Sequence, residues 1–215
     1  MNVEVVKAVA DAVRSVMILS VVILVLMLYG AKIGNLFDRL TELSYGGTKL
    51  SFSARLELLK RSARSGVTAS ETDEKIAIQR AEKHKSDLQG MRTLWVNDHP
   101  SEDRRLRDLL EDYGVRSDVV RGTEAAILRL EETRYDAVVT DEYRGGREEA
   151  VALAKRMIKL TDGSSEVPLI IYGANSGGPL PQGVQLRTNR PDEVLNKIID
   201  LAVLQASRVQ AGAAR

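Results

Sequence analysis

From Met91 onward, short apolar runs alternate with segments in which apolar residues recur every three or four positions. The alternation is typical of strands buried in a sheet and of helices that bury one face. It predicts an α/β domain over residues 90–207, with a parallel sheet that is covered by helices on both faces. The five predicted strands are 93–96, 115–120, 136–140, 167–172 and 184–186.

Two of these runs stop abruptly in polar side chains. The first strand is followed by Asn97 and Asp98, and the third is followed by Asp141. If the two strands are parallel neighbours, their carboxyl ends meet at one edge of the sheet, where open parallel sheets bind ligands. We therefore expect Asp98 and Asp141 to share a crevice.

The end of the predicted domain departs from the regular alternation. Residues 173–183 contain four glycines and two prolines, a composition that does not sustain a helix, so the usual fourth helix is predicted to be missing. The last helix is predicted to begin at Pro191. Residues 208–215 are predicted to form a disordered tail.

The amino-terminal part of the chain has a different pattern. Residues 15–31 are 17 consecutive positions without a charge, and as a helix they would be about 25 Å long. The flanking Arg14 and Lys32 can extend their side chains toward the headgroups. We predict a short outside tail and one transmembrane helix over residues 1–31. The alternatives are a signal peptide, which would need a basic leader and a cleavage site, and a buried core helix.

The distribution of basic residues predicts the orientation of this helix. Residues 1–14 contain two Lys or Arg, whereas residues 32–64 contain seven. Basic flanks remain on the cytoplasmic side of a membrane. The chain is thus predicted to be a single-pass protein of the inner or plasma membrane, with its globular part in the cytoplasm.

Residues 32–89 are predicted to link the membrane helix to the sheet. Segment 32–43 has an apolar helical face that suits a lipid surface or a partner helix, and segment 44–53 is typical of a short hairpin. A capping pattern at Ser70 begins a charged helix whose few apolar positions indicate a solvated spacer. Residues 32–63 are also a candidate segment for homo-oligomerisation.

Composition excludes several kinds of site. The chain has no cysteine, which excludes disulfides, thiolate nucleophiles and cysteine-ligated zinc. His84 and His99 are its only histidines and lie in different segments, which argues against histidine-based chemistry. A net charge of +1, from 31 basic and 30 acidic residues, argues against a nucleic-acid partner.

The order of five segments carries a resemblance to a known family. TLWVNDHP, LLEDYG, GTEAAILRLEETRYDAVVTD, VPLIIYGA and TNRPDEVLNKI follow one another between residues 93 and 198. In this order they resemble the CheY-like receiver domain of two-component response regulators, and the WVNDHP and TNRPDE motifs resemble a divergent receiver-like group attached to a single membrane helix. The resemblance covers residues 91–206. It implies a flavodoxin-like sheet of order 2-1-3-4-5 and a role in phosphorelay signalling.

The resemblance also implies roles for individual residues. Asp141 matches the phosphoacceptor, and Asp98 matches an acidic ligand of Mg²⁺. The backbone carbonyl of Tyr143 matches the third protein ligand. Arg190 stands where receivers keep a lysine and would contact a phosphoryl oxygen. Asn97 stands in the place of the first acid of the metal site.

The departures from the family pattern leave two interpretations open. Asn97 removes one negative charge, Gly173 replaces a hydroxyl residue, and Arg190 replaces a point charge by a planar guanidinium. The first interpretation is phosphorylation of Asp141 by a histidine kinase. The second is a pseudo-receiver that acts through protein–protein contacts, in which Arg190 pairs with Asp141 and any Mg²⁺ site is weakened.

Two functions of other classes remain as alternatives. The same topology underlies TIR domains, some of which cleave nucleotides with a glutamate, and Glu142, Glu148 and Glu149 lie near the predicted crevice. The other alternative is a membrane scaffold in which residues 32–63 oligomerise and the globular part recruits a partner.

Overall fold

The structure of this chain is a computed structural model that describes residues 50–63, 69–144, 147–160, 167–173 and 179–213. The chain divides into two units, 1–51 and 52–215, and nearly all described residues belong to the second. The predicted membrane helix at 15–31, the segment 32–43 and most of the predicted hairpin lie outside the described residues. Within the described ranges, no helix combines the length and the apolar character that crossing a bilayer requires.

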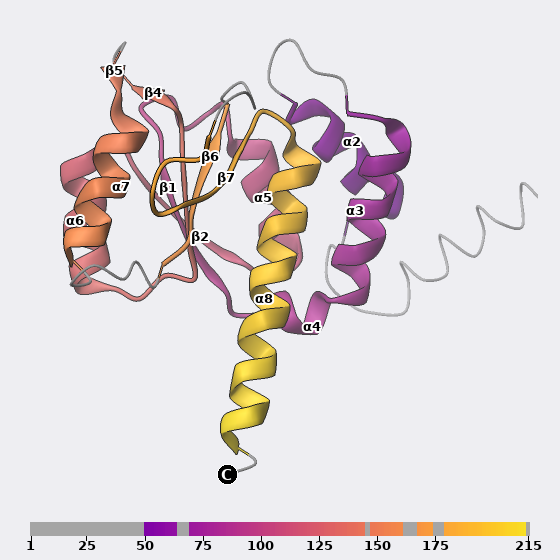
Figure 1. Cartoon of the computed structure of the whole chain (residues 1–215). Coiled ribbons are helices and arrows are strands. Elements are labelled where there is room, and N and C mark those ends of the chain that lie inside the picture. The colour runs from indigo at the N-terminus through magenta and orange to yellow at the C-terminus, as the bar shows by residue number, and fades with distance from the viewer. Residues whose placement is uncertain (1–49, 64–68, 145–146, 161–166, 174–178, 214–215) are drawn as a thin grey trace, which may run out of the picture. The chain divides into compact units, whose positions relative to one another are not determined.

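The centre of the second unit is a five-stranded parallel sheet (Figure 1). Its order is β2-β1-β3-β6-β7, which is the flavodoxin-like order 2-1-3-4-5 and confirms the predicted fold class. A separate two-stranded hairpin follows the third strand of the sheet. The strands of the sheet are β1 (Arg92–Val96), β2 (Arg116–Val120), β3 (Ala137–Thr140), β6 (Leu169–Tyr172) and β7 (Val184–Thr188), and those of the hairpin are β4 (Tyr143–Arg144) and β5 (Arg147–Glu148).

Helices cover both faces of the sheet, as the sequence pattern predicts (Figure 1). One face packs against α6 (Thr123–Glu132) and α7 (Glu149–Leu160), and the other packs against α5 (Arg104–Asp112) and α8 (Pro191–Ala213). Successive strand residues point to opposite faces. Leu94 therefore lies in the core with α6 and α7, whereas Trp95 lies in the core with α5 and α8. The described residues between β6 and β7, 173 and 179–183, contain no helix.

A third layer of helices packs on α5 and α8 (Figure 1). It consists of α2 (Phe52–Arg61), α3 (Glu71–Lys83) and α4 (Lys85–Leu88). The structure corrects the prediction of a solvated spacer here, because Ala77, Ile78 and Leu88 are 0% exposed and belong to the same core as α8. Leu59 of α2 is also fully buried in this core. The compact unit thus begins near Phe52, not at residue 90.

The predicted start of α3 is confirmed. The hydroxyl of Ser70 accepts hydrogen bonds from the backbone N–H groups of Thr72 and Asp73, at 3.2 and 3.4 Å. These bonds satisfy donors that the first turn of a helix leaves without intrahelical partners. The last two residues of the predicted hairpin are instead helical, because α2 begins at Phe52.

One ionic cluster, centred on the buried side chain of Arg55, links the third layer to the sheet domain. The guanidinium of Arg55 in α2 forms ion pairs with Glu82 of α3 and with Asp112 of α5, the latter at 2.6 Å. The Tyr113 hydroxyl donates a hydrogen bond to Glu82 at 3.2 Å, and the Arg55 guanidinium lies 5.0 Å from the centre of the Tyr113 ring. Burial raises the pKa of the Tyr113 hydroxyl well above its ordinary value. We call these four residues the Arg55 cluster.

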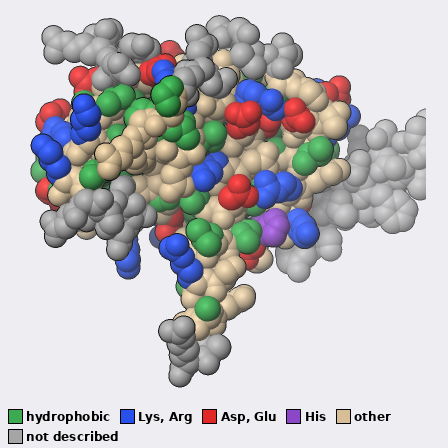
Figure 2. All heavy atoms as spheres, in the orientation of Figure 1, with side chains coloured by type: hydrophobic (Ala, Val, Ile, Leu, Met, Phe, Trp, Pro, Cys, Tyr) green, Lys and Arg blue, Asp and Glu red, His purple; other side chains and the backbone are tan. Residues whose placement is uncertain are grey.

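The last helix is longer than the sequence predicts. α8 continues to Ala213, so residues 208–213 are helical and not a disordered tail. Its second half projects beyond the rest of the unit (Figure 1). Leu204 and Val209 in this half are 49% and 68% exposed. Basic and acidic side chains are intermingled over the face shown in Figure 2, in line with the small net charge.

Candidate functional site

The two carboxylates that the sequence singles out follow β1 and β3 at the carboxyl edge of the sheet. The strands are parallel neighbours, with Val96 opposite Thr140. The backbone N–H of Asp141 donates to the carbonyl of Val96 at 3.4 Å, so Asp141 lies beside the end of β1. Val96 is two residues before Asp98 in the sequence. Asp141 is 6% exposed, and the Asp98 side chain is 31% exposed. We call this edge the crevice.

Asn97 holds the loop that follows β1. Its side-chain NH₂ group donates to the carboxylate of Asp103, and its side-chain oxygen accepts the backbone N–H of His99 at 2.7 Å. Asn97 and Asp103 are 1% and 3% exposed. Both polar atoms of Asn97 therefore have partners within the loop. Its contribution to a metal site stays a prediction.

Asp98 and the backbone of Tyr143 supply the remaining predicted metal ligands. Asp98 lies 3.9 Å from the exposed imidazole of His99. Tyr143 begins β4, two residues after Asp141. Carboxylate and carbonyl oxygens are the ligand atoms that Mg²⁺ prefers. Among the described side chains, however, no group of three or more His, Cys, Asp or Glu could hold a metal ion, so the protein ligands would include at most two carboxylates here.

Arg190 is held by carboxylates of α3 and α8. Its guanidinium lies 2.8 Å from Asp73, 2.6 Å from Asp192 and 3.5 Å from Glu193. The hydrogen bonds to Asp192 raise the pKa of Arg190 above its ordinary value. Asp141 is not among these three partners. The predicted contact of Arg190 with a phosphoryl oxygen stays a prediction, and it would require the guanidinium to exchange partners.

A different arginine reaches the neighbourhood of Asp141. Arg187 of β7 forms an ion pair with Glu142, the residue that follows Asp141. The two side chains are 20% and 7% exposed, so the pair is largely removed from water. Sequence reasoning did not single out Arg187 as a site residue, and it considered Glu142 only for a nucleotide-cleaving enzyme.

Two further positions near the crevice are candidates, Glu149 and Gly173. The Glu149 side chain has a partner within the fold, and Gly173 has no side chain. Glu149 accepts a hydrogen bond from the Thr123 hydroxyl at 3.0 Å, which joins the first turns of α6 and α7. Gly173 follows β6 and has a positive φ of 99°, and its N–H donates to the carbonyl of Thr188 at 2.8 Å. The position where receivers keep a hydroxyl therefore has no side chain to contact a phosphoryl group.

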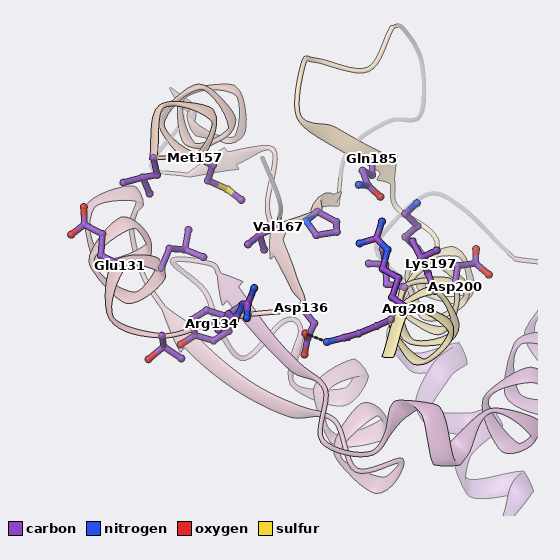
Figure 3. A pocket seen from close by; sticks show the side chains of 17 residues that line it. Glu131, Arg134, Asp136, Met157, Val167, Gln185, Lys197, Asp200 and Arg208 are labelled. Carbon is purple, nitrogen blue, oxygen red and sulfur yellow. Dashed lines mark hydrogen bonds between the residues drawn. The ribbon is translucent and has the colours of Figure 1, made fainter. Parts of the chain in front are cut away.

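A separate pocket lies at the opposite edge of the sheet (Figure 3). It has a volume of about 950 Å³ and lies among the residues that precede β3 and β6 and the middle of α8, from Lys197 to Arg208. Asp136 lies on its wall and accepts a hydrogen bond from Gln205 at 2.8 Å. Because Asp136 precedes β3 whereas Asp141 follows it, this pocket is not the predicted crevice.

Comparison with known proteins gives similarity at the level of solved structures. No family model and no curated protein sequence matches the chain. The receiver domain of the Francisella response regulator 1452 is 18% identical, covers 54% of this chain and 99% of its own, and has a TM-score of 0.47. Response regulator TrrA of Thermotoga maritima, solved with Mg²⁺-BeF, is 21% identical, with 52% and 98% covered and a TM-score of 0.44.

A third similar structure is the receiver domain of a sensor histidine kinase from Pseudomonas aeruginosa PAO1, which has a magnesium ion coordinated in its active-site cleft. It is 23% identical, covers 51% of this chain and 94% of its own, and has a TM-score of 0.44. All three TM-scores are below 0.5 and all identities are below 25%. The strand order and register of this sheet therefore carry the flavodoxin-like assignment.

Proposed function

We propose that residues 91–207, with the third helical layer packed on them, form a receiver-like signalling module whose acceptor carboxylate is Asp141. The observation that supports this proposal is that β1 and β3 are parallel neighbours, so the residues that follow them, Asn97 and Asp98 after β1 and Asp141 after β3, lie along the same edge of the sheet. Strand order reverses between these two strands, and ligands of open α/β sheets bind at such a point.

The chemistry of this site is transfer of a phosphoryl group to a carboxylate. An oxygen of Asp141 would attack phosphorus of an acyl phosphate, the bond from phosphorus to the leaving carboxylate would break, and Asp141 would become an aspartyl phosphate. Asp98, Asp141 and the Tyr143 carbonyl would hold Mg²⁺. The ion would offset the negative charge gathered at the reacting phosphoryl group.

Three observations support a weakened form of this site. Asn97 uses its amide within the loop, Arg190 is engaged by three carboxylates, and Gly173 provides no hydroxyl. Slow acceptance of a phosphoryl group follows, and contact with a protein partner becomes the main output of the module. The partner we propose is a histidine kinase or an effector that docks on the receiver-like surface.

Phosphorylation with a small donor tests this proposal. The chain is incubated with acetyl phosphate and Mg²⁺, and its intact mass is measured over time. We expect a slow gain of one phosphoryl group that Asp141→Ala abolishes. Asp108→Ala is the control, because Asp108 is a half-exposed carboxylate on α5 whose ion pair with Arg104 is long, at 3.7 Å. The same gain in Asp141→Ala, or none in the unsubstituted chain, contradicts the role of Asp141.

Membrane attachment is the second part of the proposal. It is supported by the uncharged run 15–31 and by the excess of basic residues after it. We expect the chain to remain in the membrane fraction after carbonate extraction and to be released when residues 1–31 are deleted. Protease added to sealed cells should leave the module uncut. Release of the undeleted chain by carbonate would contradict this part alone.

A further inference from the structure

We infer that Arg187, and not Arg190, is the cation that contacts an oxyanion held at Asp141, and that Glu142 occupies this cation when the oxyanion is absent. The inference rests on the proposed function, since it concerns the same site. It assigns direct contact with the oxyanion to Arg187 and competition for that contact to Glu142, and neither residue is among the predicted metal or phosphoryl contacts. The ligand class is a tetrahedral oxyanion such as a phosphoryl group.

The register of the sheet places Arg187 two strands away from β3, where its long side chain reaches the residue after Asp141. Thr140 is opposite Ile171, and Ile171 is opposite Arg187, so the three residues form one row at the carboxyl edge of β3, β6 and β7. Residues in one row point to the same face. Ile171 lies in the core with α6 and α7, and Arg187 extends on that side to Glu142, one position beyond Asp141.

An irregularity in β7 is responsible for this placement. Leu169 is opposite Val184, but Ile170 is opposite Leu186, so β7 contains one residue more than β6 between these pairs. An extra residue of this kind reverses which face the following side chains reach. Without it, Arg187 would be opposite Tyr172 and would point to the face of α5 and α8. The irregularity thus directs this arginine toward the side of the sheet where Glu142 lies.

The chemistry of the guanidinium allows a bound oxyanion to exchange with Glu142. The Arg187 and Glu142 side chains are 20% and 7% exposed, so each compensates a charge that burial would otherwise penalise. A guanidinium has five donors in a planar fork and binds carboxylate and phosphoryl oxygens alike. A phosphoryl group on Asp141 would add negative charge beside Glu142 and compete with it for Arg187.

The contacts of Arg190 disfavour a movement of its guanidinium toward Asp141. Its three carboxylate partners belong to α3 and to the first turn of α8, and none of them is near β3 in sequence. To reach Asp141, its guanidinium would have to leave all three. Arg187 already contacts the residue next to Asp141. The internal carboxylate of Glu142 therefore lowers the affinity of the site for oxyanions, and this adds to the weakening that Asn97 causes.

The test measures binding of beryllofluoride, which mimics a phosphoryl group on a carboxylate, to the whole chain in detergent with Mg²⁺ present. Trp95 is the single tryptophan and lies buried in β1, so its fluorescence reports on this strand. The variants are Glu142→Gln, Arg187→Gln and Arg187→Lys. The control is Glu124→Gln, which removes the partner of Arg156 from an exposed ion pair of 2.7 Å between α6 and α7.

The expected results follow from competition for one guanidinium. Glu142→Gln should lower the half-saturating beryllofluoride concentration about tenfold, and Arg187→Gln should raise it at least about tenfold, since a charge-assisted hydrogen bond is lost. Arg187→Lys keeps the charge without the planar fork and should give a smaller rise. If Arg187→Gln does not fold, Arg187→Lys alone tests the role of Arg187. Glu124→Gln should match the unsubstituted chain.

Two results would overturn this inference in different ways. If binding needs Asp141 but is unchanged by the substitutions at Glu142 and Arg187, or falls further in Arg190→Gln than in Arg187→Gln, the inference fails and the proposed function stands. If no variant binds beryllofluoride, or if Asp141→Ala binds it equally well, both fail.

Discussion

The crevice and the third helical layer hold their charged groups in opposite ways. In the crevice, Glu142 pairs with an arginine from a different strand at the edge where a ligand would bind. In the third layer, the Arg55 cluster lies between helices that bury apolar side chains, such as Ile78, around it. In the Arg187–Glu142 pair, a ligand can take the place of the Glu142 carboxylate. In the Arg55 cluster, by contrast, the helices leave no such replacement, so loss of a contact there only destabilises the fold. Stability should therefore depend on the layer, and ligand affinity should depend on the crevice.

One of the two largest effects is expected from Arg55→Ala. It removes the shared partner of Glu82 and Asp112. Only Asp112, with a side chain that is 10% exposed, is then left as a largely buried charge, so the expected cost is about 3 kcal/mol, the low end for a broken buried pair. Thermal unfolding followed by Trp95 fluorescence should show a melting temperature lowered by at least about 6 °C. Arg61→Ala is the matched control, because Arg61 and its partner Glu57 have exposed side chains. Equal melting temperatures for the two variants would show that the cluster does not fasten the layer.

A second substitution tests whether α3 belongs to the core or is a spacer. Ile78 is 0% exposed, and Ile78→Ala should cost about 2–5 kcal/mol, because it removes buried methyl groups and leaves a cavity. Ile76 lies in the same helix and is 48% exposed. Ile76→Ala should change stability by less than about 0.5 kcal/mol in the same unfolding measurement. A spacer would give the two variants the same small effect.

The smallest effect is expected at Glu74 of α3, which is 4% exposed. Burial raises the pKa of its carboxyl above the ordinary value, so ionisation is less favourable in the folded chain than in the unfolded one. The contribution of the protonated Glu74 carboxyl to the free energy of unfolding is complete below the ordinary pKa. It is lost as pH rises through the raised pKa of the folded chain. Glu74→Gln should therefore be more stable at pH 7, by up to about 1 kcal/mol.

The pH dependence of that difference is the decisive measurement for Glu74. The gain of Glu74→Gln over the unsubstituted chain should shrink as pH falls toward the ordinary carboxyl pKa, where Glu74 is protonated in both states. Melting temperatures at several pH values provide the comparison. Glu71→Gln is the control, because Glu71 lies on the exposed side of α3 and the Lys75 hydrogen bond lowers its pKa. A difference that grows on acidification would contradict the burial argument.

Sequence patterns were sufficient for the sheet but not for the third layer. The strands, their helices and the positions of Asp98 and Asp141 follow from apolar periodicity and from the polar residues at strand ends. The sequence of α3 indicates a spacer because its apolar positions are few, and two of the buried ones, Ala77 and Ala81, have only a methyl side chain. Small side chains allow helices to approach closely, so α3 packs on α8 with few large apolar residues.

The contacts of the two arginines were also beyond sequence reasoning. Arg187 contacts Glu142 because β7 has one extra residue relative to β6. The sequence of β7, VQLRT, contains no local pattern that predicts this extra residue. Arg190 contacts Asp73 because α3 packs beside α8, so this partner could be identified only after the third layer was known. Both contacts depend on long-range packing, which the order of residues along the chain does not encode locally.

The length of α8 has a mechanical consequence. Its 23 residues correspond to about 34 Å, and the helix begins next to Arg190 and ends well past the opposite edge of the sheet. The first half of α8 packs against the sheet and the third layer, and the second half has no such support from the described part of the chain. A small tilt of the packed half therefore produces a larger displacement at the end of the helix. An ångström gained or lost beside the crevice would swing Ala213 through a wider arc.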